Sequence, residues 1–541
     1  MNRRLYGLAA NPALPPALLD RLVALAVAEA PEPASGPFDA DADTGTGTGT
    51  GTEELVLALT GRADLGRALA RVLAARNEAT GVQLAYGGQL DPDDVDPAAW
   101  PVVAVALLDA GADRPDWARL LAAHPDPGVR WRLASCPGLP PEVAQALADD
   151  RDTGVVAELA LWTTAEAVAD RLARHPHAEV RYSAALNEAV SPAALAALIT
   201  GEGLDPAVSC LVCDVKGVPF THHPYCPDPD CELRPGAACD GTHGSTVAET
   251  RERAARNPSA PPAAAASLAG DPSMFVRWAL AERSDLPQEV YGRLAEDAVP
   301  GVREAVAGNA AIGEALVRAL AADPSHEVRR ALAHHPGLPL DVLAGLARST
   351  RIGPVLLPRI AAAGADELAG AAASPHAAVR MLAAQRRDLP PGVRDALAAD
   401  PDAAVVASVA PHPGLPEERL RSMVAAHGGR VVARVAANPD APGALLEELA
   451  RREPPVRKVL RAIAAHPHAT AEALRPCLAD PKAGPLAAAH PALPPALLVE
   501  LLDGGDEGLA EAAAGNPALP VAVMEELLAR YPEPGVTRPV S

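Results

Sequence analysis

The chain has 541 residues, of which 49% are hydrophobic but only 3% aromatic, and its formal net charge is −22 at pH 7. A surface this acidic repels phosphate backbones and anionic lipids, which argues against a dedicated nucleic-acid or membrane-surface binder. No stretch approaches eighteen uninterrupted apolar residues, and Asn and Pro interrupt the opening "MNRRLYGLAANPALPPALL". We therefore expect a cytoplasmic protein with neither a signal peptide nor a membrane span.

Self-similar segments recur along nearly the whole chain. "HPDPGVRWRLASCPGLPPEVAQALA" from residue 124 and "DPSHEVRRALAHHPGLPLDVLAGLA" from residue 323 share a V-R-x-x-L-A step followed by L-P-x-x-V-x-x-x-L-A. Apart from the step from Val180 to Val276, which includes the cysteine-rich segment, anchor valines recur every 24 to 27 residues. This period indicates stacked helical repeats rather than separate domains. The anchor valines are Val129, Val155, Val180, Val276, Val302, Val328, Val355, Val379, Val405, Val431 and Val456.

Each repeat has two places where Asp, His, Asn or Ser precedes Pro, and both predict helix starts. We expect Asp271-Pro272 and Asp323-Pro324 to open the first helical piece, and Asn438-Pro439 and Asn516-Pro517 to start the turn into the second. The second piece carries leucines along one face, as in "PPALLDRLVAL" at residues 15–25. Neither piece can bury its apolar stripe alone, so the sequence predicts an elongated, curved all-α solenoid of about 25-residue repeats with a shared core.

The run V-R-x-A-L-A-x-N-P-x-L-P-x-x-L-L-x-x-L-A-x-D-P resembles the leucine-rich repeat variant (LRV) family over roughly residues 1–28, 54–209 and 246–530. This resemblance implies repeats that pair an α-helix with a short 3₁₀-helix in a right-handed superhelix. It also implies a small cysteine-rich iron–sulfur module, which some members of that family carry. HEAT-like repeats are the alternative fold, because they share the V-R step but lack paired x-Pro starts at this short period.

Two segments interrupt the array, one rich in Asp and Thr-Gly and one rich in cysteine. The acidic segment and the C-terminal tail are predicted to be disordered, because they have little apolar surface to bury. The expected organisation is a first repeat (1–30), the linker (31–53), N-terminal repeats (54–209), a metal-binding insertion (210–245), C-terminal repeats (246–530) and the tail (531–541).

Five of the seven cysteines lie in the insertion. Cys210-x2-Cys213 is a metal-binding knuckle, and Cys226-x4-Cys231 follows at a separation that suits a tetrahedral Cys₄ zinc site. A segment this short, with few large apolar groups, cannot fold on hydrophobic burial alone, so Zn²⁺ would supply the missing stability. No pattern of a catalytic zinc site is present, such as His-Glu-x-x-His, and we predict a structural ion.

The end of the insertion favours a different cofactor. Cys239-Asp240-Gly241-Thr242-His243 resembles the Cys-Asp-Gly-Ser-His signature of a class of [2Fe–2S] proteins. That resemblance implies Cys239 and His243 as cluster ligands with Cys231 upstream, although Pro229 stands where the class has another cysteine. An iron–sulfur cluster is therefore the alternative to zinc, and unligated thiols are the third option. The candidate ligands are Cys210, Cys213, Cys226, Cys231, Cys239 and His243, with His222 and His223 nearby.

An arginine follows the anchor valine in many repeats and would form a ladder along one face of the array. In one interpretation each guanidinium pairs with Asp or carbonyl groups of its own or a neighbouring turn. In the other, the ladder is an anion-binding groove for an acidic protein segment or a phosphate backbone, and the net negative charge favours protein. This arginine ladder comprises Arg130, Arg181, Arg277, Arg303, Arg329, Arg380 and Arg457.

The remaining reactive side chains fit structural roles. Cys136 and Cys477 are predicted to be packing residues, and no Gly-rich phosphate loop or nucleophile elbow is present. Six histidines directly precede Pro and are predicted to cap helices or form turns, namely His124, His175, His335, His412, His466 and His490. We therefore predict a non-enzymatic scaffold that binds a protein partner, an acidic or extended segment, on its concave face. An iron–sulfur redox or iron-sensing protein is the alternative, and a nucleic-acid-binding solenoid is the third hypothesis.

Overall fold

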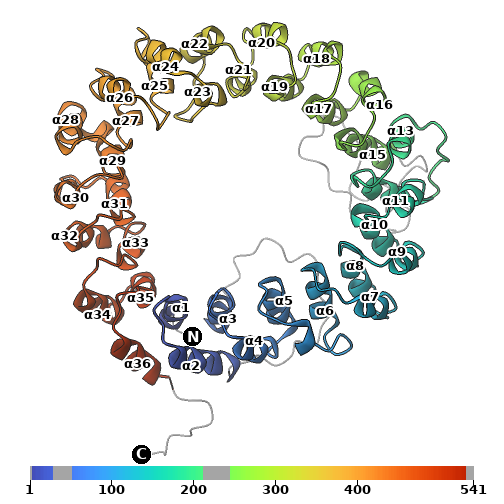
Figure 1. Ribbon diagram of the computed structural model, residues 1–541, viewed down its shortest axis with the longest axis horizontal. Helices are drawn as coiled ribbons and strands as arrows, with labels where there is room; N and C mark the ends of the chain where they lie inside the picture. Colours follow the sequence, from blue (N-terminus) through green and yellow to red (C-terminus); the bar gives the residue numbers. More distant parts are fainter. Residues whose placement is uncertain (1–2, 29–50, 211–243, 532–541) are drawn as a thin grey trace, which may run out of the picture. The chain divides into compact units, whose positions relative to one another are not determined.

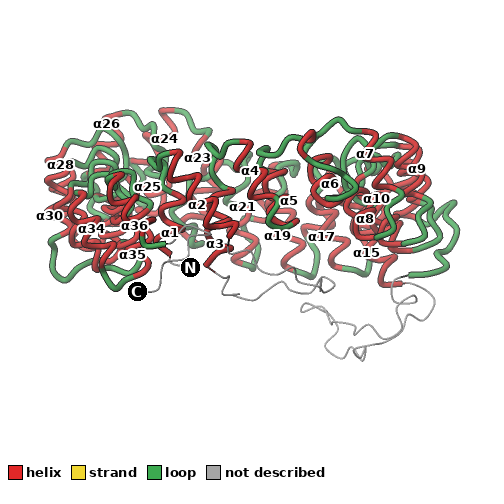
Figure 2. Tube along the Cα trace, turned by 90° about the horizontal axis from the view of Figure 1, so that it is seen from below, coloured by secondary structure: helices red, strands yellow, loops and turns green. Residues whose placement is uncertain are grey.

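The computed structural model describes residues 3–28, 51–210 and 244–531. Short α-helices joined by turns make up these residues, and no β-strand occurs among them (Figure 2). The all-α repeat fold is thus confirmed. The predicted linker, tail and insertion lie outside the described residues except at their edges, where α3 begins at Gly51 and α15 at Gly244.

Most repeats contribute one helix to a first row and one to a second row. A first-row helix begins near the V-R step and packs against the first-row helices of the adjacent repeats. Both helices are α-helical in most repeats, whereas the LRV resemblance implies a 3₁₀-helix in the second position. The described 3₁₀-helices are η1 (Pro92–Asp94), η2 (Ser267–Gly270), η3 (Gly428–Arg430) and η4 (Arg475–Ala479).

The chain divides into two compact units, and unit 2 comprises residues 95–352 and 357–359. Within unit 2 the first row lies on the inner side of the curve that the unit's helices follow (Figure 1). Its first-row helices are α6 (Pro101–Asp109), α8 (Pro127–Ala134), α10 (Thr153–Trp162), α12 (Ala178–Ala184), α15 (Gly244–Arg256), α17 (Met274–Glu282), α19 (Pro300–Gly308) and α21 (His326–Leu332). Its second-row helices are α7 (Pro115–Ala122), α9 (Pro141–Ala148), α11 (Glu166–Ala173), α13 (Pro192–Thr200), α16 (Pro262–Ala266), α18 (Gln288–Ala295), α20 (Glu314–Leu320) and α22 (Leu340–Ser349).

Unit 1 combines residues 1–94 with residues 353–356 and 360–541. Its first-row helices are α1 (Arg3–Ala10), α3 (Gly51–Thr60), α5 (Glu78–Tyr86), α25 (Ala377–Ala383), α27 (Ala403–Val409), α29 (Val432–Val435), α31 (Arg457–Ala464), α33 (Gly484–Ala488) and α35 (Glu507–Ala514). Its second-row helices are α2 (Pro16–Ala28), α4 (Arg67–Ala74), α24 (Ala365–Ala372), α26 (Pro391–Ala398), α28 (Glu417–His427), α30 (Gly443–Ala450), α32 (Ala471–Leu474), α34 (Pro495–Asp503) and α36 (Val521–Ala529). The first repeat packs on the last, since α1 contacts α35. The elongated array expected from the sequence would instead leave these two repeats apart.

Helix starts differ in one respect from the expectation. The carboxylate of Asp126 caps α8 by accepting a hydrogen bond from the amide of Gly128 at 2.8 Å. Asp323 does not cap α21, because that helix begins three residues later, after Ser325. Its carboxylate accepts from the amide of Ser325 at 2.8 Å and forms a turn. Asp271 forms the same turn ahead of α17, so both residues leave carboxylate oxygens for other partners.

Small aliphatic side chains fill the core between the rows, as the low aromatic content requires. Val129 and Leu133 of α8 are both buried, and the same two positions are buried in most repeats. Two predicted anchors are wrong. Val456 is only half-buried and precedes α31, in which Val459 is the buried valine. The side chain of Val355 is 42% exposed. Leu357 and Ile360 are buried in its place, and α23 spans only Pro358–Ala361.

Candidate functional site

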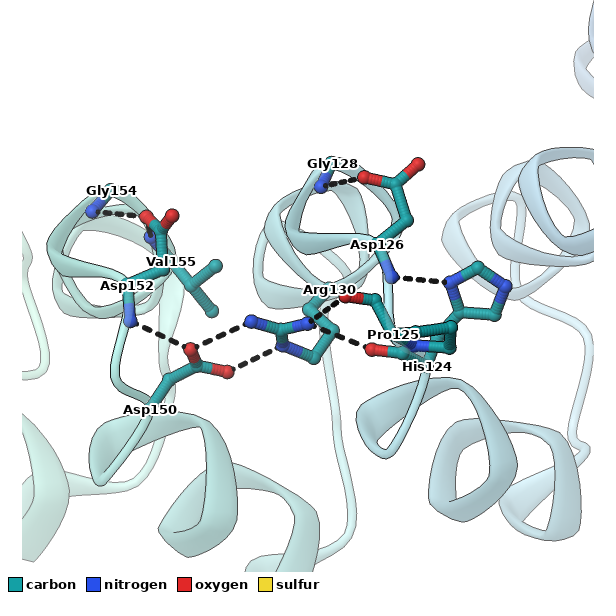
Figure 3. Close-up of polar contacts among 9 residues, drawn as sticks. All are labelled: His124, Pro125, Asp126, Gly128, Arg130, Asp150, Asp152, Gly154 and Val155. Carbon is teal, nitrogen blue, oxygen red and sulfur yellow. Dashed lines mark hydrogen bonds and ion pairs between the residues drawn. The ribbon is translucent and has the colours of Figure 1, made fainter.

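The arginine ladder lies between repeats, as Arg130 illustrates (Figure 3). Its Nε and Nη2 atoms donate to the two carboxylate oxygens of Asp150, at 2.7 and 3.0 Å. Its Nη1 atom donates to the carbonyl oxygens of His124 and Pro125, at 2.7 and 3.1 Å. Asp150 opens the following repeat, whereas His124 and Pro125 open the repeat to which Arg130 belongs. The guanidinium therefore joins the openings of two consecutive repeats.

Three further arginines repeat this arrangement. Each is bidentate to an aspartate twenty residues later and also donates to a carbonyl oxygen six residues earlier. All of these charged side chains are largely buried. The pairs are Arg277–Asp297, Arg303–Asp323 and Arg380–Asp400, with shortest N–O distances of 2.6, 2.8 and 2.6 Å. Their geometry is that of the structural interpretation, in which the ladder joins neighbouring turns.

Arg181 lies where the array approaches the insertion, and it bonds only to backbone. It donates to the carbonyl oxygens of His175 and Asp205, at 2.5 and 2.7 Å. An isolated parallel bridge between His177 and Ser209 holds the chain beside the same turn. The strand-like contact therefore fixes the point from which the insertion departs.

Two ladder residues in the second half of the chain have weaker carboxylate contacts or none. Arg329 donates to the hydroxyl of Thr350 at 3.1 Å and to the carbonyl oxygen of Asp323. The side chain of Arg457 is 81% exposed, and its Nε lies 3.8 Å from a carboxylate oxygen of Asp480. Among the ladder residues, Arg457 is thus the one whose guanidinium mostly faces solvent.

The ladder ion pairs keep their carboxylates ionised at neutral pH. The hydrogen bonds from Arg303 lower the pKa of Asp323 below its ordinary value, although burial opposes the shift. For Asp150, burial is the largest influence and raises the pKa, but hydrogen bonds from Arg130 and from the Asp152 amide outweigh it. The net pKa of Asp150 is therefore also lowered.

A second set of inter-repeat bonds occurs where the sequence predicts only a turn. Asn438 Oδ1 accepts from the amide of Asp440 at 2.9 Å, which confirms the turn. Asn438 Nδ2 also donates to the carbonyl oxygens of Ala410 and His412 in the preceding repeat, at 2.6 and 2.7 Å. We call this set the asparagine ladder. Its members are Asn11, Asn187, Asn257, Asn309, Asn438 and Asn516, each of which bonds two carbonyl groups of another repeat.

Histidine takes the same position in other repeats. His466 Nε2 bonds the carbonyl oxygen of Asn438 at 2.7 Å, while its Nδ1 accepts from the amide of His468 at 3.1 Å. His412 Nε2 bonds the carbonyl oxygen of Ala384 at 2.8 Å. The predicted turn role is confirmed by Nδ1 contacts to the amide two residues later in His124, His175, His335, His466 and His490.

Of the six candidate metal ligands, only Cys210 lies within the described residues, and its side chain is buried. Cys213, Cys226, Cys231, Cys239 and His243 fall outside them. No cluster of three or more His, Cys, Asp or Glu side chains suited to a metal ion occurs in the described part of the chain. The zinc site and the iron–sulfur alternative therefore stay predictions.

Cys136 and Cys477 are packing residues, as predicted. Both are buried. Cys477 Sγ lies 3.4 Å from the carbonyl oxygen of Leu460, and Cys136 Sγ lies 3.8 Å from that of Val105. Burial raises the pKa of each thiol to about 12, so both stay protonated and unreactive.

Exposed tryptophans on the first row of unit 2 were not predicted from the sequence. Trp131 of α8, Trp162 of α10 and Trp278 of α17 are 43%, 52% and 37% exposed. Trp131 and Trp278 each follow an anchor valine by two residues, about 200° around the helix from the buried face. They therefore point away from the second row. The repeat position that Trp131 and Trp278 share is the signal that could have identified these two.

No protein-family model matches the chain, and neither does any curated protein sequence. Among solved structures, the chain is similar to a leucine-rich repeat variant, with 28% identity over 47% of this chain and 89% of that one and a TM-score of 0.27. Importin beta aligns with 12% identity over 88% of this chain and 67% of its own, with a TM-score of 0.25. Kap121p bound to Ste12p aligns with 12% identity over 95% and 51%, with a TM-score of 0.18. None of the described helices is long and apolar enough to cross a membrane. The stacked two-helix repeats themselves make this chain a helical-repeat protein.

Proposed function

We propose that the chain is a non-enzymatic scaffold that binds an extended segment of a protein partner along the first row of unit 2. The exposed tryptophans of that row carry the proposal. Tryptophan is enriched among the residues that dominate protein–protein binding energy, because its large rigid side chain desolvates well on contact. Most of the few aromatic side chains of a soluble repeat would otherwise be expected in its core.

The spacing of these side chains supports an extended partner. Trp131 and Tyr182 both occupy the position two residues after an anchor valine, on α8 and α12. The Tyr182 ring is stacked by the guanidinium of Arg253, 3.3 Å from the ring centroid. Aromatic groups repeated at one position along a row offer successive contacts to a segment that follows the row.

The contacts of the arginine ladder bear on the charge of the partner. The acidic partner expected from the sequence needs free guanidinium groups, but Arg130 and Arg303 already pair with aspartates. The net charge of −22 also repels acidic segments. Both facts favour an extended segment that is neutral or basic and carries apolar side chains for the tryptophans.

The test is selection of binders from a displayed library of random peptides, followed by affinity measurement with the full chain. Trp131→Ala and Trp278→Ala should each weaken an enriched peptide by about 2 kcal/mol, roughly thirtyfold in Kd. Leu120→Ala is the matched control, because Leu120 is 49% exposed on second-row helix α7. Equal affinity in the Trp131→Ala and Leu120→Ala variants would remove the basis of the proposal, and so would a library that yields no binder.

For the insertion we propose a structural Zn²⁺ ion bound by cysteines of residues 210–245. Support comes from five cysteines in a short segment that has little apolar surface. Elemental analysis and a visible spectrum of protein purified without oxygen test this directly. One zinc per colourless chain is the expected result. Stoichiometric iron with charge-transfer absorption would instead support the iron–sulfur redox or sensing alternative, with Cys239 and His243 as ligands.

A further inference from the structure

The first and last repeats of unit 1 pack together as if they were consecutive. Helix α1 lies against α35 in Figure 1, and α2 contacts α36. Asn11 Nδ2 donates to the carbonyl oxygens of Ala514 and Asn516, at 2.9 and 2.8 Å. These acceptors are an asparagine-ladder residue and the residue two positions before it. Asn438 bonds the same two positions of its preceding repeat, at Ala410 and His412. The first repeat thus occupies the place that follows the last.

The two helices approach each other closely. A Cβ atom on Gly7 would lie 2.0 Å from the carbonyl oxygen of Glu511, so only glycine fits at this point of α1. The contact atom belongs to the backbone of α35, which cannot rotate away as a side chain would. Leu5 and Leu8 of α1 are buried beside it. The contact therefore has the close fit of a packed core.

Hydrogen bonds from two arginines extend the contact to the second row. Arg4 Nε donates to the carbonyl oxygen of Leu502 at 2.8 Å. Arg21 of α2 donates from Nη2 to the carbonyl oxygens of Leu528 and Tyr531, at 3.2 and 3.4 Å. Both rows of the first repeat are thus tied to the last two repeats.

Solenoids usually end in capping repeats with a polar outer face, because the stacking face of an ordinary repeat is apolar. The first and last repeats here, "LAANPALPPALLDRL" and "AAAGNPALPVAVMEELL", keep the same apolar pattern as the internal ones. We propose that the outer stacking face of the last repeat is a binding surface whose occupant is the first repeat of the same chain. The contact thereby covers the outer stacking faces of these two repeats.

This arrangement prevents end-to-end association of separate chains. A detached first repeat would expose two complementary faces, one at each end of the array. Head-to-tail contacts of this kind between copies build rings where the rotation closes and open-ended assemblies where it does not. The intramolecular contact competes with such assembly because the two ends belong to one chain and have a high effective concentration.

A cross-linking experiment tests whether the contact forms within one chain. Arg3 and Glu507 are exposed at its rim, with Nε and Oε2 3.9 Å apart. The full chain with Arg3→Cys and Glu507→Cys is treated at low concentration with a short bismaleimide, and the linked peptides are mapped by mass spectrometry. We expect the link between positions 3 and 507 within single chains. A link found only between chains, or none, would overturn the proposal.

A second experiment opens the contact. Gly7→Leu places a side chain against the α35 backbone while improving the helix propensity of α1. We expect loss of the intrachain link and concentration-dependent oligomers in sedimentation velocity. Gly292→Leu in α18 is the matched control, since no atom lies within 4 Å of a Cβ placed there. A folded Gly7→Leu chain that stays monomeric and links as well as the control would contradict the proposal. If Gly7→Leu does not fold, the cross-link in the chain that retains Gly7 decides alone.

Discussion

Arg303 and Asp323 lie twenty residues apart in the chain, yet two hydrogen bonds of 2.8 and 3.1 Å join them across a repeat boundary. The same guanidinium also donates to the carbonyl oxygen of Asp297 at 2.8 Å. One side chain thus forms hydrogen bonds with the first residues of two consecutive repeats. An ion pair in this position joins two neighbouring repeats, and its guanidinium and carboxylate groups bond to each other.

Removal of the ion pair between Arg303 and Asp323 should destabilise the chain. Arg303→Ala leaves the buried carboxylate of Asp323 without its partner, and we expect a loss of about 1.5–3 kcal/mol in the free energy of unfolding. Arg457→Ala should change it by less than about 0.5 kcal/mol, because that side chain is solvated. Urea unfolding followed by circular dichroism measures both. Equal losses in the two variants would show that the ladder pairs contribute nothing specific.

Stability should fall in acid because of the ladder carboxylates. Hydrogen bonds from Arg303 lower the pKa of Asp323 in the folded chain, and the pKa of Asp150 is also lowered. An aspartate whose folded pKa is depressed contributes its full stability above the unfolded value of about 3.9 and loses it as pH falls through the folded pKa. The urea concentration at the midpoint of unfolding should therefore decrease as the pH falls below about 4. Asp323→Asn should be less stable at pH 7 and less sensitive to acid than the unaltered chain.

The asparagine ladder gives a graded prediction. Asn438→Ala removes the donor for the carbonyl groups of Ala410 and His412, and unsatisfied buried carbonyls cost about 1–3 kcal/mol. Asn438→His should cost less, because His466 makes one such bond from the same position in another repeat. Thermal unfolding of the two variants compares them. A histidine variant less stable than the alanine variant would argue against equivalent roles.

The buried thiols predict selective labelling. Burial raises the pKa of Cys136 and Cys477 to about 12. At pH 8 these thiols carry almost no thiolate, so iodoacetamide should leave both unmodified in the folded chain. Peptide mapping after a short labelling pulse, with and without urea, measures the difference. Rapid modification of either cysteine without urea would mean that its repeat opens locally.

The fold was predictable from the sequence because the repeat pattern determines which face of each helix is apolar. Four residues separate Val129 from Leu133, which places both on one face of a helix, and any similar pattern has the same consequence. The prediction of Val355 as a core residue was wrong, because a valine at the expected spacing does not reveal that the chain there is not helical. Its core position passes to Leu357.

The inter-repeat contacts were predictable only where both partners are side chains. The spacing of Arg130 and Asp150 recurs at Arg277 and Asp297. A search for arginine–aspartate pairs at this spacing would therefore have found the ion pairs between repeats. The acceptors of Asn438 are backbone carbonyl groups, which every residue carries, and no pattern marks them. The predicted ligands of the insertion still await the metal analysis.

The contact between Asn11 and Ala514 spans 503 residues of chain, whereas the ladder pairs span about twenty. During synthesis at about 5–20 residues per second, the first repeat is complete on the order of 25 to 100 seconds before its partner exists. Throughout that interval the apolar side of α1 that later meets α35 is uncovered. The N-terminal repeat therefore keeps an uncovered apolar face for longer than an internal repeat does, and it can dock on α35 only after all the repeats between them have been synthesised.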